Sequence, residues 1–344
     1  MKNLIIYILT VISVIVLSGS CRNRSIPDIS NINTELVVKR LEKDLFAIQA
    51  EDIDNQIQML EKKYGKFFDL YNFKIITIGG SDEKDYEIYL KQFLDDKIIK
   101  QIYNKCEEIF PDILEIEEAL NQSFSFYKYY FPYRQLPDIY TFISGFNQSV
   151  VTDEKILGIG LDKYFGDTCD FYTRLAWPNY IKKNMQPEKI VSDCMKAWAF
   201  MEFDSGRPNI NQEIIKNNAI NHMLFHGKIM YFLDAVLPYE EDSLKIGFSN
   251  NQLEWCQNNE AQMWDYLIEN KLLFSTELLT IRKLVEDAPF TSYFTDQSPG
   301  RAGVWIGWQI IKSYMKKNNC SLEELMLEND YQKIMTISGY NPKQ

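Results

Sequence analysis

The two histidines of this 344-residue chain, His222 and His226, lie four residues apart. They fall within Asn211–Pro238, where the spacing of apolar residues predicts a long amphipathic helix. Side chains four residues apart leave a helix from the same face, so both imidazoles would point in one direction. Zinc peptidases hold their metal with a histidine pair at this spacing, in the motif H-E-x-x-H. Metal binding is therefore the first chemistry that the sequence indicates.

A zinc site of this kind needs a third protein ligand and an open position for water. The best candidate is Glu260, because Asn259-Glu260 begins a predicted helical run 34 residues after His226. Glu254 and Asp234 are weaker candidates. We therefore expect no cofactor, with a vestigial zinc ion held by His222, His226 and Glu260 as the alternative.

Met223 stands where an H-E-x-x-H enzyme carries its general base. That base takes the proton of the metal-bound water, which a thioether cannot do. The nearest other acid on the predicted helix, Glu213, lies more than two turns from His222. Three interpretations stay open: two structural histidines, a metal bound without hydrolysis, and a hydrolase whose base comes from elsewhere. The first is favoured, and the chain is predicted not to be an enzyme.

A second candidate site surrounds Arg301, within Asp296–Gln309 (DQSPGRAGVWIGWQ). The residues before Arg301 predict a turn that leads into a helix. An arginine beside a helix N-terminus favours a carboxylate or a phosphate. Together with Asp234, Arg301 is therefore our candidate for a ligand or partner groove. The competing interpretation is structural, since Gly303 and Gly307 lie one turn apart and would let this helix approach another closely.

Aromatic residues are dense in Phe124–Tyr133 (FSFYKYYFPY) and at Trp305 and Trp308. Such stretches can line a binding groove. Large apolar rings are more often buried in a core, and that is the favoured interpretation here.

The elements that must position these residues are mostly helices, with a small sheet in the middle of the chain. Val37–Phe46 predicts a strand that runs into a helix, and residues 67–80 have an irregular, aromatic-rich pattern. Short β-rich segments are predicted at Asp138–Gly145, Val150–Thr152 and Lys155–Leu161. Helical spacing covers Asp52–Gly65, Asp82–Phe110, Ile113–Tyr130, Met195–Phe203, Gln252–Asn270, Glu277–Val285 and Gly303–Lys317. This order predicts an α+β fold that is predominantly helical, with the small sheet before the histidine helix. The folded body is placed at 36–344, with 36–135 and 136–344 as an alternative subdivision.

The first 21 residues indicate a secretory signal. Lys2 supplies a charge, and Leu4–Leu17 is an apolar run of signal-sequence length that is short for a spanning helix. The small residues before Cys21 resemble a bacterial lipobox, although Ser18 stands where an aliphatic residue is usual. We predict that Cys21 is lipidated and that residues 22–35 form a polar tether. An ordinary cleaved signal and an uncleaved anchor are the alternatives, and all three place the protein outside the cytoplasm.

Composition excludes several other classes. The net charge of −11 argues against binding of nucleic acid and against electrostatic docking on anionic lipid. The five cysteines that follow Cys21 are scattered and include no C-x-x-C pair. A disulfide framework and a zinc ribbon are therefore not expected.

Stretches along the whole mature chain share the pattern of one family. They are Cys21 at the end of the signal, Arg40–Phe46, Ile156–Gly166, Gly227–Pro238, residues within Gly247–Trp264, Ala288–Phe290 and Ser298–Tyr314. Together they resemble the gliding-motility lipoprotein GldB of the Bacteroidetes. The last stretch and the one around Asn259-Glu260 are the most specific.

This resemblance implies a gluzincin-like fold, a distant and decayed relative of the metallopeptidases. By that likeness, His222, His226 and Glu260 fall at ligand positions, and Met223 falls at the lost base. It also implies a non-catalytic role in the cell envelope, supporting gliding motility and the associated secretion machinery through protein contacts. The alternatives are a zinc-dependent, peptidase-like hydrolase and a peptide- or glycan-binding module in the old active-site cleft.

The residues after Cys21 bear on location. Arg22-Asn23-Arg24 follows it, with no acidic run. Surface-exported lipoproteins of these bacteria tend to carry acidic residues there. We therefore expect a protein lipid-anchored to the outer membrane and facing the periplasm, whose partners are other envelope gliding and secretion proteins and not nucleic acid.

Overall fold

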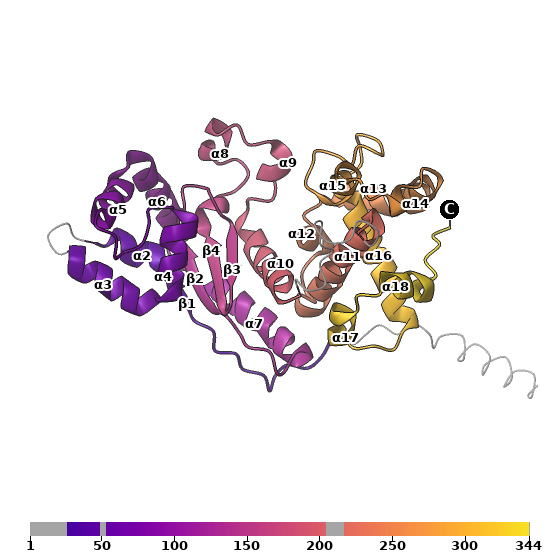
Figure 1. Ribbon diagram of the computed structural model, residues 1–344, viewed down its shortest axis with the longest axis horizontal. Helices are drawn as coiled ribbons and strands as arrows, with labels where there is room; N and C mark the ends of the chain where they lie inside the picture. The colour runs from indigo at the N-terminus through magenta and orange to yellow at the C-terminus, as the bar shows by residue number, and fades with distance from the viewer. Residues whose placement is uncertain (1–25, 49–52, 204–216, 344) are drawn as a thin grey trace, which may run out of the picture. The chain divides into compact units, whose positions relative to one another are not determined.

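The computed structural model describes residues 26–48, 53–203 and 217–343. The chain divides into two compact units, Met1–Asn31 and Ile32–Gln344. The predicted signal segment, Cys21 and residues 211–216 of the predicted histidine helix lie outside the described residues. The second unit is mostly helical with a small four-stranded sheet, which confirms the predicted α+β class (Figure 1). None of the helices in the described ranges is long and apolar enough to cross a membrane.

The sheet has the strand order β1-β2-β4-β3. Strands β1 (Val38–Arg40), β2 (Asp138–Phe142) and β4 (Ile156–Gly160) are parallel, and β3 (Val150–Asp153) pairs antiparallel with β4. All of β4 is buried, as its unbroken apolar sequence requires. The predicted strands in this region are therefore confirmed, with β3 at one edge.

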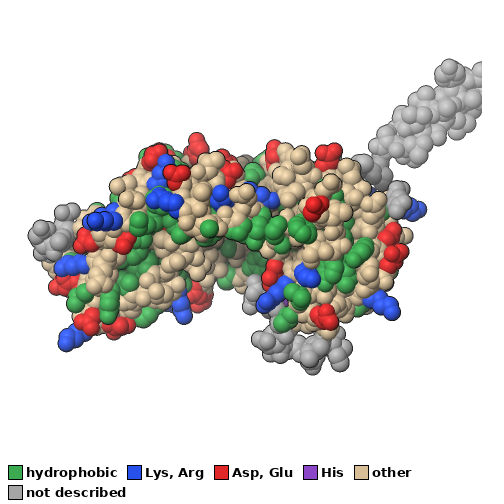
Figure 2. Space-filling model, turned by 90° about the horizontal axis from the view of Figure 1, so that it is seen from above, with side chains coloured by type: hydrophobic (Ala, Val, Ile, Leu, Met, Phe, Trp, Pro, Cys, Tyr) green, Lys and Arg blue, Asp and Glu red, His purple; other side chains and the backbone are tan. Residues whose placement is uncertain are grey.

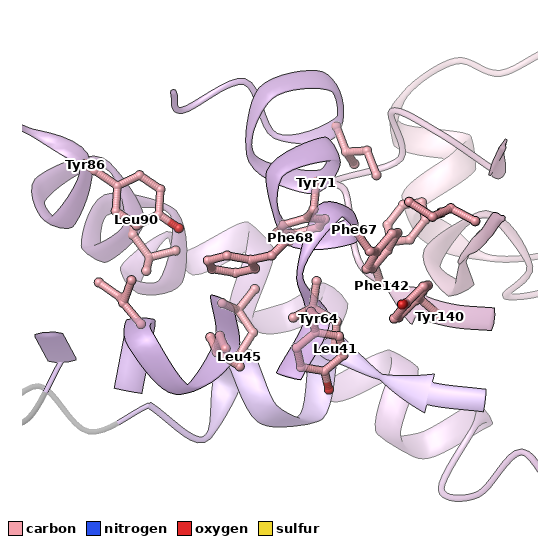
Figure 3. Packing of buried hydrophobic residues seen from close by; sticks show 14 of the residues in the cluster. Leu41, Leu45, Tyr64, Phe67, Phe68, Tyr71, Tyr86, Leu90, Tyr140 and Phe142 are labelled. Carbon is pink, nitrogen blue, oxygen red and sulfur yellow. The ribbon is translucent and has the colours of Figure 1, made fainter. Parts of the chain in front are cut away.

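One face of the sheet is covered by helices from the N-terminal part of the chain. These are α2 (Leu41–Phe46), α3 (Ile53–Tyr64), α4 (Lys66–Leu70) and the π-helix η2 (Tyr71–Ile75). Phe67 stacks on Tyr140 of β2 with ring centroids 4.2 Å apart, in an aromatic cluster shown in Figure 3. A Cβ on Gly158 of β4 would lie 2.8 Å from the Phe67 ring, so glycine gives the ring its room. The prediction of irregular structure over 67–80 was wrong for the part up to Ile75.

The next helices are α5 (Tyr86–Asp95), α6 (Lys97–Ile109) and α7 (Leu114–Tyr130). The predicted single helix over Asp82–Phe110 is thus two helices. The break lies at Asp96, whose carboxylate accepts hydrogen bonds from the backbone N–H groups of Ile98 and Ile99. An aspartate that caps a helix N-terminus in this way starts a new helix.

The rest of the chain is almost entirely helical. Its helices are α8 (Asp170–Arg174), α9 (Asn179–Lys182), α10 (Ile190–Glu202), α11 (Ala219–Val236), α12 (Asp242–Ile246), α13 (Asn250–Asn258), α14 (Glu260–Glu269), α15 (Leu278–Val285), α16 (Ala302–Lys317), α17 (Leu322–Leu327) and α18 (Tyr331–Ser338). Short 3₁₀ turns are η3 (Leu161–Lys163), η4 (Pro187–Lys189) and η7 (Leu272–Phe274).

Helix α11, the histidine helix, is the centre of this half. It begins after Asn218, whose side chain caps it by accepting from the N–H of Asn221. Buried residues occur all around α11, so the predicted amphipathic helix is instead a core helix. It packs among α10, α15 and α16 (Figure 1).

Helices α11 and α16 touch through glycines. A Cβ on Gly307 would lie 1.9 Å from the carbonyl oxygen of Met223, and one on Gly227 would lie 2.4 Å from Gly307. Gly303 meets Leu284 of α15 in the same way, at 2.7 Å from its carbonyl oxygen. The helix-packing interpretation of Gly303 and Gly307 is confirmed.

Candidate functional site

The histidine pair lies in a packed, aromatic environment. His222 is buried, with 6% of its surface exposed. The His226 ring lies 5.5 Å from the ring of Phe200 on α10 and 5.9 Å from that of Phe225. His226 thus meets α10 through an aromatic contact.

Glu260 has a structural partner. It is the first residue of α14, and its carboxylate accepts a 2.6 Å hydrogen bond from the hydroxyl of Tyr340. Among the described residues, no three His, Cys, Asp or Glu side chains are arranged to hold a metal ion. The structure therefore does not bring His222, His226 and Glu260 together as a ligand set, and the vestigial zinc ion stays a prediction.

Met223, at the position of the missing base, is fully buried. Its backbone carbonyl faces Gly307 of α16. This turn of α11 is therefore part of the α11–α16 packing. A carboxylate placed here would carry a large desolvation cost.

Arg301 is held at the start of α16 by contacts on two sides. Its φ of 60° lies in the left-handed region, which is unusual for a residue other than glycine. The guanidinium Nε lies 2.8 Å from Asp287, and Nη2 donates a 2.7 Å hydrogen bond to the carbonyl of Ile246. With this pairing Arg301 is fixed beside the C-terminus of α12.

Arg301 lines a pocket of about 290 Å³. The start of β3, the outer face of α10 and the end of α12 form its other walls. The charged residues that line the pocket are three cations, Lys189, Lys196 and Arg301, and two carboxylates, Asp193 and Asp287. Phe200, which contacts His226, also lines this pocket, so the pocket extends to within one side chain of the histidine helix.

The cations in this pocket act on one another. Burial lowers the pKa of Lys196 to about 8, and repulsion from Arg301 contributes. Burial and then the charge of Arg301 also lower the pKa of nearby Lys183. Lys189 is paired with Asp193 at 3.3 Å and donates to the carbonyl of Leu244. The pocket thus favours anions over cations.

Asp234 does not join Arg301 in this pocket. Its carboxylate accepts from Lys245 at 2.7 Å and from the indole N–H of Trp308 at 2.8 Å. Lys312 lies over the Trp308 ring at 3.6 Å from its centroid. Asp234 therefore joins α11 to α12 and α16, and its role in this arrangement is structural.

The sequence interpretation missed Lys189, Asp193 and Lys196. Asp193 and Lys196 lie three residues apart on one face of α10, and Lys189 lies four residues before Asp193 at the end of η4, so this spacing could be seen in the sequence. This spacing alone does not distinguish residues that line a pocket from residues on a solvated helix face. The other side of the pocket includes Arg301 and Gly247, which are distant in the sequence. The aromatic segment, by contrast, was interpreted correctly as core for Phe124, Phe126 and Tyr127, which are buried, but not for Tyr129 and Tyr133, which are exposed.

The fold and the site define an α+β protein with a core helix that keeps a histidine pair, and with a charged pocket beside that helix. The chain belongs to the family of the gliding motility protein GldB, whose model matches residues 22–342. It is thus a gliding-motility-related lipoprotein, associated with the cell envelope, of a family named for motility and not for a reaction. No curated protein and no solved structure matches this chain. The relation to gluzincins stays a prediction.

Proposed function

We propose that this protein is a non-catalytic lipoprotein that supports gliding motility and the associated secretion machinery through protein contacts. One observation carries the non-catalytic part: the residue at the base position, Met223, is fully buried against α16. The helix that would hold a zinc hydrolase's machinery is used for packing. The described residues gather no metal-ligand group to replace it.

The sequence supports attachment through Cys21. Leu4–Leu17 supplies an apolar signal, and Ser18-Gly19-Ser20 supplies the small residues before the acylated cysteine. Because Arg22-Asn23-Arg24 follows Cys21, we place the lipid anchor in the outer membrane with the body in the periplasm.

Protein contacts are supported by apolar side chains that remain at the surface. Phe274, Leu278 and Leu279 in η7 and α15 are 68%, 43% and 64% exposed, and Ile268 on α14 is 49% exposed. Three of these residues fall between positions 274 and 279, and exposed apolar residues that lie close together favour association with another protein. Hydrophobic side chains lie between charged ones on the face shown in Figure 2.

The proposal is tested by complementation in a gliding bacterium that lacks its own copy of the gene. We expect Glu260→Gln and His226→Gln to restore spreading as well as the unchanged chain does, because neither residue takes part in a reaction. Cys21→Ser should fail to restore spreading, because it removes the lipid anchor. Protein levels are followed by immunoblot in every strain.

Metal analysis of the purified protein is the control. Loss of spreading in His226→Gln at a normal protein level, together with about one zinc per chain that this variant lacks, would show that the protein is a metalloenzyme. Full function of Cys21→Ser would contradict the anchor.

A further inference from the structure

The pocket beside α10 concentrates positive charge in a chain whose net charge is −11. Its cations come from separate parts of the chain. Lys189 ends η4, Lys196 lies about two turns further along α10, and Arg301 precedes α16. Lys189 and Arg301 are buried, with 5% and 9% of their surfaces exposed. Burying a cation costs free energy unless an anion is paired with it. The ion pairs of each cation therefore show whether the pocket has positive charge left for a bound anion.

Lys196 is the pocket cation that makes no ion pair or hydrogen bond within the described part of the chain. Lys189 has Asp193 at 3.3 Å, and Arg301 has Asp287 at 2.8 Å. Asp193 and Asp287 attract the Lys196 ammonium without pairing with it. Burial first, and then repulsion from Arg301 and Lys189, outweigh this attraction and lower the pKa of Lys196. An anion in the pocket would supply the missing partner.

The donors favour a tetrahedral oxyanion over a carboxylate. Arg301 already uses Nε and one hydrogen of Nη2, so the Nε–Nη2 side of its guanidinium is not available as a fork for a planar carboxylate. The lysine ammonium groups have no planar pair of donors, so each would donate to a separate oxygen of the ligand from its own direction. Three such donors match the separated oxygens of a phosphate group.

The pocket is larger than a phosphate ion needs. Its volume of about 290 Å³ is at the lower end of pockets that hold small organic ligands. Phe200 and Val150 give one side an apolar lining. The cationic side would hold the phosphate, and the apolar side would hold a small organic group.

We propose that this pocket binds a small phosphomonoester, with Lys196 as the main charge partner of the phosphate and with Lys189 and Arg301 beside it. This site is independent of the proposed function in gliding and secretion, since it requires neither a reaction nor a particular protein partner. The phosphate comes either from a soluble metabolite-sized molecule or from a lipid headgroup, and the test separates the two sources.

The test is titration calorimetry on the full-length protein in detergent. Inorganic phosphate and glycerol 3-phosphate should bind, whereas acetate at equal ionic strength should not. Lys196→Gln should weaken phosphate binding at least tenfold. Lys163→Gln is the matched control and should bind like the unchanged protein, because Lys163 is also half-buried, with a pKa lowered to about 8 mainly by burial, but does not line the pocket.

Three results would overturn the proposal. They are equal binding of phosphate and acetate, unchanged affinity in Lys196→Gln, and absence of phosphate binding at millimolar concentration. Vesicles that contain phosphatidate form the second arm. Binding to them that glycerol 3-phosphate cannot displace would reject the soluble ligand in favour of a headgroup.

A second measurement needs no variant and so does not depend on the folding of Lys196→Gln. Phosphate should protect Lys196 from acetylation at pH 8, as read by mass spectrometry, and should leave Lys163 equally labelled. Equal labelling of Lys196 with and without phosphate would contradict the proposal.

Discussion

Asp162 is a fully buried carboxylate whose surroundings explain both its position and its pKa. It accepts hydrogen bonds from the backbone N–H groups of Ser144 and Phe146, at 3.0 and 2.6 Å. These bonds hold the turn after β2. Burial nevertheless outweighs them and raises the pKa of Asp162 to about 6.

This pKa predicts how stability depends on pH. The carboxyl group binds a proton more tightly in the folded state than in the unfolded state, where its pKa is 3.8. The contribution of Asp162 to the free energy of unfolding should therefore fall as pH rises from about 4 to about 6. The total loss is on the order of 3 kcal/mol.

Asp162→Asn should remove this fall, because an amide oxygen can keep both backbone hydrogen bonds without a charge. Urea unfolding between pH 4 and pH 7, followed by tryptophan fluorescence, measures it. Asp82→Asn changes an exposed side chain and is the control. A variant that loses stability over this pH range as steeply as the unchanged protein would show that Asp162 is not the titrating group.

Residue type and spacing revealed only part of the candidate site. Arg301 was found from its place before a helix, and it does line the pocket. Lys196 was not found, because its environment depends on a segment 105 positions further along the chain. The histidine pair drew attention through a familiar spacing, but spacing says nothing of a third ligand, and Glu260 is bonded to Tyr340.

At the scale of elements, helices with strong periodicity were predictable and their breaks were not. Helix α16 was expected at Gly303–Lys317 and is found at Ala302–Lys317. The break at Asp96 was missed. At Asn259 a helical start was expected, but the helical spacing over Gln252–Asn270 was not divided there into two helices. The apolar spacing continues across each break, so the pattern alone predicts one long helix.

The glycine contact between α11 and α16 gives a prediction at this scale. Gly307→Ala adds a methyl group 1.9 Å from the Met223 carbonyl, and backbone cannot yield as a flexible side chain does. The added methyl group should force the two helices apart. The packing lost in this way should destabilise the fold by more than the roughly 1 kcal/mol that the higher helix propensity of alanine contributes. We expect a net loss of about 2 kcal/mol or more in the free energy of unfolding.

Chemical denaturation of Gly307→Ala measures this loss. Lys316→Ala on the same helix is exposed, so it tests the effect of alanine without the clash. Equal stability of the two variants would show that α11 and α16 do not meet as closely as described.

For the whole molecule, the fold class was predictable and its organisation around α11 was not. The order of helical and β-rich segments predicted a helical α+β protein. The histidine helix was expected to carry a polar face, because Asn217, Asn218, Asn221 and the histidines are polar. In the structure Asn217 and His222 are buried, while Asn218, Asn221 and His226 are half-buried. Even Lys228 is buried, with its ammonium donating to the carbonyls of Met326 and Glu328.

If the core is held together by packing alone, removal of metal should not change the thermal stability of the protein. A folded state that bound zinc at a thousand times its dissociation constant would gain about 4 kcal/mol, a rise of several degrees in the unfolding midpoint. Because the described residues supply no such ligand group, we expect the thermal unfolding midpoint to be the same, within about one degree, after dialysis against EDTA and after zinc is added back. A midpoint that falls with EDTA and recovers with zinc would contradict this. If the midpoint of His226→Gln also falls with EDTA and recovers with zinc, the metal is bound away from α11. If only the unchanged protein responds to EDTA and zinc, the histidine pair binds the metal.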